Sequence, residues 1–141
     1  MCFRLTACRN CTQVVVCVLA RHGMHWTQIM QGEDWSMISR IWHGYTTQAN
    51  ADAYENLLKG KILAGISNRH IRGYRGIHLL RRSITDGVEF ITVMWFDSIE
   101  AVQEFAGDDY EKAAVPPEAR ALLSRFDDRS QHDEVRDEKK T

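Results

Sequence analysis

The stretch VEFITVMWFDSIEAVQEFAG, residues 88–107, decides the fold of this chain. Its first nine residues predict a strand with large apolar side chains on both faces. One face carries Phe90, Met94 and Phe96, and the other carries Ile91, Val93 and Trp95. Asp97-Ser98-Ile99-Glu100 has the pattern of a capping box, which begins a helix that we expect to end at Gly107.

The segments on either side complete a pattern of strand, helix, strand, strand, helix and strand. The further elements that we expect are a strand at 37–45, a helix at 51–63, a strand at 77–84, short helical turns at 108–114 and 118–124, and a strand at 129–135. Asn50 and Gly65 are the expected caps of the first helix, and Thr85-Asp86-Gly87 is the expected hairpin turn. This order predicts an α+β fold of the ferredoxin-like βαββαβ type, with an antiparallel four-stranded sheet and helices on one face.

Two helices can cover only one face of such a sheet, which leaves the second apolar face of residues 88–96 without cover. Leaving a large apolar side chain in water forgoes about 1.5–3 kcal/mol. A contiguous apolar face of this kind usually marks an interface. We therefore predict a homodimer in which two sheets pack face to face.

The charged residues are unevenly distributed, which indicates a domain boundary near residue 36. Residues 1–32 contain no Asp, Glu or Lys, whereas all 19 acidic residues follow them. We interpret residues 1–36 as a disordered extension or as a start assigned too far upstream of Met37. Residues 37–135 are the expected domain, and residues 136–141 are an expected disordered, charged tail.

Two other interpretations of residues 1–36 stay open. Arginines precede the apolar run at 14–20, as in a targeting peptide, although no cleavage site of small residues follows. Cys8-x2-Cys11 followed by His22-x2-His25 resembles a zinc site, but the gaps are too short for a zinc finger. Because all four cysteines precede residue 37, no disulfide framework holds the domain, and we expect a cytoplasmic protein.

The composition argues against several classes of protein. No apolar run is long enough to cross a membrane, and 18 basic side chains nearly balance the 19 acidic ones. Residues 69–82 carry five arginines and no acid, a pattern compatible with a nucleic-acid patch, an anionic partner or pairing with acids elsewhere. The overall charge balance favours pairing, so we expect no nucleic-acid partner. The usual phosphate-loop, zinc-protease and serine-nucleophile motifs are missing from the sequence.

Residues 38–44, 54–58, 90–98 and 99–107 resemble the antibiotic biosynthesis monooxygenase family. The most specific part is the strand ending in Trp95, followed by Asp97-Ser98 and a helix that carries Phe105. The resemblance extends over the whole expected domain and implies a dimeric α/β barrel. Characterised members of this family include cofactor-independent oxygenases of aromatic polyketide phenols, and related enzymes degrade haem.

The haem-degrading branch is poorly matched. That branch uses an Asn on the first strand, a Trp at the end of the third strand and a His after the second helix. Trp95 matches the Trp, but the first strand offers Arg40 and Trp42, and residues 113–116 contain no His to bind haem iron. The resemblance therefore implies a protein without a cofactor and without a metal site.

The cofactor-free branch needs an apolar pocket, a group that moves a proton and a group that stabilises negative charge. The candidate catalytic residues are Arg40 for the anion, His43 and His132 for the proton, and Trp95. The candidate pocket residues are Trp42, Tyr54, Phe105 and His78, the last of which could also move a proton. Each has an alternative structural interpretation, because aromatic side chains fill cores and Arg40 can pair with an acid such as Glu89.

Two functions are compatible with these residues. The first is a cofactor-independent monooxygenase that acts on an aromatic or quinol-type small molecule. The second is a non-catalytic dimeric α/β barrel that binds a small hydrophobic ligand. The enzyme needs a closed pocket that contains at least one of His43, His78 and His132 with Arg40 or Tyr54 nearby, whereas a layer packed solid with aromatic side chains favours the second function.

Overall fold

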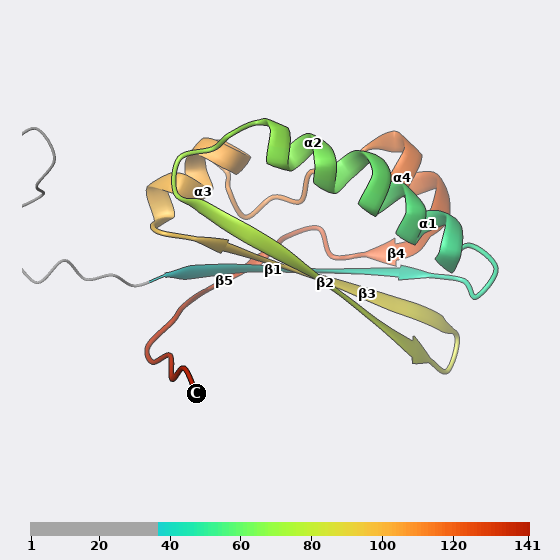
Figure 1. The fold of residues 1–141 in the computed structure, drawn as a ribbon. Helices are drawn as coiled ribbons and strands as arrows, with labels where there is room; N and C mark the ends of the chain where they lie inside the picture. The colour runs from blue at the N-terminus through green and yellow to red at the C-terminus, as the bar shows by residue number, and fades with distance from the viewer. Residues whose placement is uncertain (1–36) are drawn as a thin grey trace, which may run out of the picture. The chain divides into compact units, whose positions relative to one another are not determined.

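An antiparallel sheet carries all the described helices on one of its faces (Figure 1). The computed structural model describes residues 37–141, and the predictions for residues 1–36 lie outside this range. The elements are β1 (Ile38–Thr46), α1 (Ala51–Leu57), the π-helix η1 (Leu58–Ile62), α2 (Leu63–Asn68), β2 (Tyr74–Ile84), β3 (Gly87–Phe96), α3 (Ile99–Ala106), α4 (Pro117–Leu122), β4 (Leu123–Phe126) and β5 (Gln131–Glu134). None of the helices in this range has the length and apolarity that a membrane span needs.

The strand order is β2-β3-β1-β4, and β5 pairs with β1 as well. β1 and β3 pair along their whole length, from Ile38 opposite Phe96 to Thr46 opposite Val88. This arrangement confirms the ferredoxin-like α+β fold. The number of strands differs from the prediction, because β4 and β5 share the free edge of β1, where one strand was expected.

The region before β4 explains the miscounted strand. The helix predicted at 118–124 is present as α4, but it ends at Leu122, and Leu123 takes extended dihedral angles (φ −82°, ψ 137°). Phe126 then packs against the ring of Trp42 at a centroid distance of 6.2 Å. The helical turn predicted at 108–114 is wrong, since that segment forms turns and a single bridge between Lys112 and Arg129.

The first helical segment is longer than predicted. It runs through Gly65 to Asn68, so the expected C-cap at Gly65 is wrong. Ile62, Leu63 and Ile66 pack against the core clusters, and this apolar contact continues on both sides of Gly65. The side chain of Asn50 makes no cap hydrogen bond.

Helix α3 lies at the predicted position, but it begins one residue later than the capping-box pattern from Asp97 to Glu100 implies, and Asp97 pairs with Arg75 instead. Ser98 is its N-cap, and its Oγ accepts a hydrogen bond from the backbone N–H of Ala101 at 3.2 Å. The helix ends at Gly107, whose φ of 86° suits a residue without a β-carbon. Val102 on the covered face is fully buried.

The core under the helices forms two clusters. One surrounds Tyr54 and Phe90, whose rings meet edge to face with centroids 5.0 Å apart. The other surrounds Met94 and Phe96, and the ring of Phe105 lies 5.7 Å from that of Phe96. The predicted alternation along β3 is confirmed, because Phe90, Met94 and Phe96 are buried under the helices while Ile91, Val93 and Trp95 lie on the other face.

No helix of residues 37–141 lies over that other face of the sheet (Figure 1). Its centre is apolar: Ile41 lies opposite Val93 in the register of β1 and β3, and Ile91 lies opposite Leu80 in β2 and β3. Leu80 is 48% exposed, and its three neighbours are half-buried. We refer to Ile41, Leu80, Ile91 and Val93 as the open apolar face.

The arginines of residues 69–82 pair mainly with acids of the same domain, as the charge balance predicted. The ion pairs are Arg75 with Asp97, Arg81 with Asp52 and Glu55, and Arg82 with Glu89. Arg69 instead donates to the carbonyl oxygen of Phe105 and lies over its ring. These contacts connect the arginine-rich segment to the helical layer and to β3.

Gly87, the first residue of β3, provides a test of the hairpin geometry. Its φ is 150°, and a β-carbon built there would lie 2.0 Å from the carbonyl oxygen of Thr46. Gly87→Ala should therefore lower the free energy of unfolding by about 2 kcal/mol or more. Gly60→Ala is the control: a β-carbon there meets nothing within 4 Å, so it should be neutral or stabilising by about 0.5–1 kcal/mol. Urea denaturation measures both, and equal stability of the two variants would contradict this account of the hairpin.

Candidate functional site

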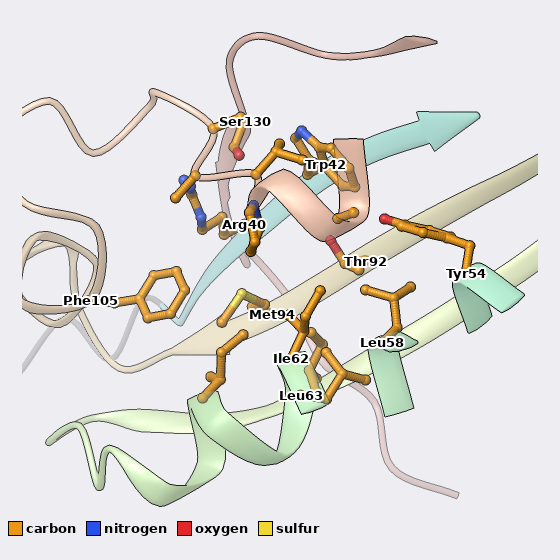
Figure 2. A pocket seen from close by; sticks show the side chains of 17 residues that line it. Arg40, Trp42, Tyr54, Leu58, Ile62, Leu63, Thr92, Met94, Phe105 and Ser130 are labelled. Atoms are coloured by element: carbon orange, nitrogen blue, oxygen red, sulfur yellow. The ribbon is translucent and has the colours of Figure 1, made fainter. Parts of the chain in front are cut away.

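A pocket lies between the covered face of the sheet and the helical layer, where the two core clusters meet (Figure 2). Its empty space is about 600 Å³, open solvent at the mouth included. The lining residues are Arg40, Trp42, Tyr54, Leu58, Ile62, Leu63, Ile66, Ile77, Thr92, Met94, Phe105, Ala113, Ala114, Val115, Pro116, Ala119 and Ser130. Figure 2 shows Phe105 and Tyr54 at opposite ends of the pocket. The layer between sheet and helices is therefore not packed solid.

Strand β1 contributes the main polar and aromatic groups of the pocket. Because side chains alternate along a strand, Arg40 and Trp42 both point to the helical side. The indole Nε1–H of Trp42 donates to the carbonyl oxygen of Asp127 at 2.8 Å, which fixes the ring. A β-carbon at Gly44 would lie 2.8 Å from Cη2 of this ring, so the glycine makes the room that Trp42 occupies.

Arg40 is a buried cation, with only 5% of its surface exposed. Its Nη1 donates to the carbonyl oxygen of Tyr110 at 2.6 Å, and its Nη2 donates to that of Lys112 at 3.4 Å. No carboxylate among residues 37–141 forms an ion pair with it. Burial lowers the pKa of Arg40 to about 10, so the group stays charged at neutral pH.

The alternative in which Arg40 pairs with Glu89 is wrong. Glu89 lies on the opposite face of the sheet, where it contacts His43 and Arg82. The hydrogen bond from His43, followed by the contact with Arg82, holds the pKa of Glu89 below its ordinary value. The two faces therefore differ in charge balance, since Glu89 is paired whereas Arg40 is held only by neutral groups.

His132 of β5 stands opposite Arg40 in the register of the sheet. Its Nε2 lies 3.0 Å from Nη1 of Arg40. A guanidinium only donates, so this nitrogen must accept, and the imidazole is neutral with its proton on Nδ1. Burial and then the positive charge of Arg40 lower the pKa of His132, while Glu111 and Asp133 act in the opposite direction. The ring of Tyr110 packs edge to face on this imidazole at 5.1 Å.

The rest of the lining is mostly apolar, with three hydroxyl groups. Tyr54 is 1% exposed, and its burial raises the pKa of the phenol, which therefore stays protonated. Ser130 is 5% exposed, and its Oγ has no hydrogen-bond partner within residues 37–141. Thr92 on β3 supplies the third hydroxyl. Among residues 37–141, no Asp, Glu or His lines the pocket and no cluster of potential metal ligands is present.

The structure divides the sequence-derived candidates between the two faces of the sheet. Arg40, Trp42, Tyr54 and Phe105 line the pocket, and His132 contacts Arg40 from outside the lining. His43, His78 and Trp95 lie on the opposite face. There the indole Nε1–H of Trp95 donates to Nδ1 of His78 at 2.9 Å, and His43 contacts Glu89 at 2.8 Å.

Sequence reasoning missed Ser130, Thr92 and the segment 113–116 that closes one side of the pocket. The alternation of side chains along a strand could have identified two of them, Thr92 and Ser130. Thr92 lies between the buried residues Phe90 and Met94, and Ser130 lies two residues before His132. The segment 113–116 offers no periodicity from which its position could be read.

The contact between His132 and Arg40 predicts a pH dependence of stability. The lowered pKa of His132 means that the unfolded chain binds more protons below about pH 6.5, so stability falls as pH drops through this value. His132→Gln keeps an acceptor near Nε2 but does not titrate, so it should lose less stability between pH 7.5 and pH 5.5. His70→Asn, at an exposed position with φ of 49°, is the control that should behave like the wild type. Urea denaturation at both pH values decides, and equal losses in all three proteins would contradict the assignment.

Comparison with known proteins gives a likeness of fold. No protein-family model matches the chain, and no curated protein matches it. A Bacillus cereus protein assigned as an antibiotic biosynthesis monooxygenase is similar with a TM-score of 0.53 at 14% identity, over 75% of this chain and 99% of that chain. A Caulobacter crescentus protein with the same assignment has a TM-score of 0.51 at 19% identity, over 74% of this chain and 92% of that chain. The described domain therefore has the fold of the antibiotic biosynthesis monooxygenases, as the resemblance of its residues predicted.

Proposed function

We propose that the chain is a cofactor-independent, monooxygenase-like enzyme that acts on an aromatic or quinol-type small molecule in this pocket. The observation that carries the proposal is a buried cation, Arg40, in the wall of an apolar pocket with aromatic side chains. Trp42, Tyr54 and Phe105 supply faces and edges against which an aromatic ring can pack. The fold of the structural neighbours agrees with this function.

The chemistry needs an electron-rich anion that reacts with dioxygen. A phenol has an ordinary pKa of about 10, and a cation within contact distance lowers a neighbouring acid's pKa by about 1–3 units. Arg40 would thus favour the ionised form of a bound phenol and stabilise it as charge redistributes. Within residues 37–141 the pocket lining offers no carboxylate or imidazole to take the proton, so the proton would leave through the open mouth to water.

The lack of a proton-accepting side chain among the described lining residues favours a second candidate function. A non-catalytic barrel that binds a small hydrophobic ligand needs the apolar walls and no proton acceptor. The two functions differ in one measurable property, because both predict binding of aromatic molecules but only the enzyme consumes oxygen.

Oxygen uptake by the purified full-length chain, pretreated with a chelator, tests the enzyme. We expect uptake with hydroquinones or anthrone-like phenols. Ala114 is exposed and lines the mouth, so Ala114→Trp should reduce the rate about tenfold or more by obstructing entry. Ala64→Trp, at an exposed position of α2 outside the pocket lining, should retain it. Binding of these phenols without uptake would replace the enzyme by the binding protein, and uptake abolished by the chelator would contradict cofactor independence.

We also propose that the chain is a homodimer through the open apolar face. Four apolar side chains meet there in register, and they are bordered by the Trp95–His78 pair and by Glu89 with its ion-pair partners. A second copy of the same sheet presents an equally apolar centre and so removes both from water.

Sedimentation velocity at micromolar concentration tests the dimer. The wild-type chain should sediment as a dimer, and Val93→Lys, which places a charge at the centre of the open apolar face, should sediment as a monomer. Ala64→Lys on the helical side is the matched control and should remain dimeric. A monomeric wild type would refute this interface.

A further inference from the structure

The charge of Arg40 has no counter-charge within the described domain. The residue is 95% buried, and its three acceptors are two backbone carbonyl oxygens and a neutral imidazole. The neighbouring walls of the pocket are Met94, Phe105 and aliphatic side chains. An isolated cation in such surroundings is costly, so a ligand that brings a negative charge gains more here than it would at the protein surface.

The hydrogen-bond inventory of Arg40 shows which donors are free. A guanidinium has five N–H groups. Nη1 uses both of its N–H groups, on Tyr110 and His132, and Nη2 uses one, on Lys112. The unused donors in the described domain are therefore on Nε and Nη2. These two nitrogens form the side of the guanidinium that binds a carboxylate through two parallel hydrogen bonds.

Ser130 adds a second unpaired polar group to the same pocket. Its Oγ is buried without a partner among residues 37–141, although buried hydroxyl groups are usually hydrogen-bonded. Ser130 directly precedes β5, whose first residues Gln131 and His132 pair with Ile41 and Arg40 of β1. Ser130 therefore lies at the edge of β1, one position beyond the pair of Ile41 and Gln131. Figure 2 shows Ser130, Arg40 and Trp42 on the same side of the pocket.

We propose that the physiological ligand is an aromatic monocarboxylate, bound by Nε and Nη2 of Arg40 and by the hydroxyl of Ser130. Its ring lies in the apolar part of the pocket, between Trp42 and the side chains of the helical layer. Residues 37–141 contribute no Asp or Glu to the lining that would repel the carboxylate. This inference rests on the pocket of the proposed function and narrows its substrate class, but it does not depend on oxygen chemistry.

A pair of probes with the same shape and different charge tests the inference. Calorimetric titration of the full-length chain at pH 7.5 would compare 2-naphthoate with the neutral 2-naphthamide. We expect the carboxylate to bind about tenfold or more tightly than the amide, as for hydrogen bonds assisted by charge. Ala114→Trp should weaken binding of both probes, which places them in the pocket.

Variants then assign the charge preference to its residues. Arg40→Met should bind the two probes about equally, and Ser130→Ala should weaken naphthoate binding several-fold. Arg72→Met removes an exposed arginine outside the pocket lining and should leave the preference unchanged. Should Arg40→Met fail to fold, the comparison of the two probes on the wild type and on Ser130→Ala still decides.

The outcomes separate this inference from the proposed function. Equal binding of the two probes, tighter binding of the amide or no binding of naphthoate overturns the inference, whether or not quinols drive oxygen uptake. A naphthoate preference that Arg72→Met removes and Arg40→Met keeps also overturns it. Selective naphthoate binding through Arg40, together with no oxygen uptake from the phenols, supports the inference and refutes the proposed enzymatic function.

Discussion

The pairing of β1 with β3 is the constraint on which the rest of this structure depends. The two strands are hydrogen-bonded along their whole length, and alternation then assigns every side chain to one of two faces. A shift of β3 by one residue would move Phe90 out of the helical layer and bring Glu89 into it, and a shift of β1 by one residue would instead exchange Arg40 for residues such as His43. The buried rings of Phe90 and Phe96 prevent such a shift, because both would be transferred to the uncovered face.

This register buries Arg40, which costs desolvation free energy. Groups at the edge of the sheet reduce that cost by accepting hydrogen bonds from the guanidinium. The two short strands β4 and β5 replace one continuous strand, and the segments around them present the carbonyl oxygens of Tyr110 and Lys112 and the imidazole of His132 to the guanidinium. All three groups are neutral acceptors. They satisfy hydrogen bonds without cancelling the charge, so the positive charge of Arg40 acts on whatever occupies the pocket that it lines.

The sequence predicted the order of the elements, the two faces of β3 and the end of α3 because these depend on periodicity and on local capping. It misplaced the end of the first helix, because contacts of Ile62, Leu63 and Ile66 outweigh the local preference of Gly65. It grouped His43, His78 and Trp95 with Arg40 because residue type alone does not show on which face of the sheet a side chain lies. Parity along β1 separates His43 from Arg40, but the contact of Arg40 with His132 depends on pairing between residues 92 positions apart.

The position of His132 also limits what the pocket can do. The lone pair on its Nε2 is the natural proton acceptor in this region, but it already accepts a hydrogen bond from Nη1 of Arg40. Protonation would break this contact and place two cations side by side, so the imidazole orients Arg40 better than it acts as a base. Tyr54 cannot replace it, because its raised pKa keeps the phenol protonated. The proposed reaction therefore begins with a substrate that is already ionised or that ionises under the influence of Arg40.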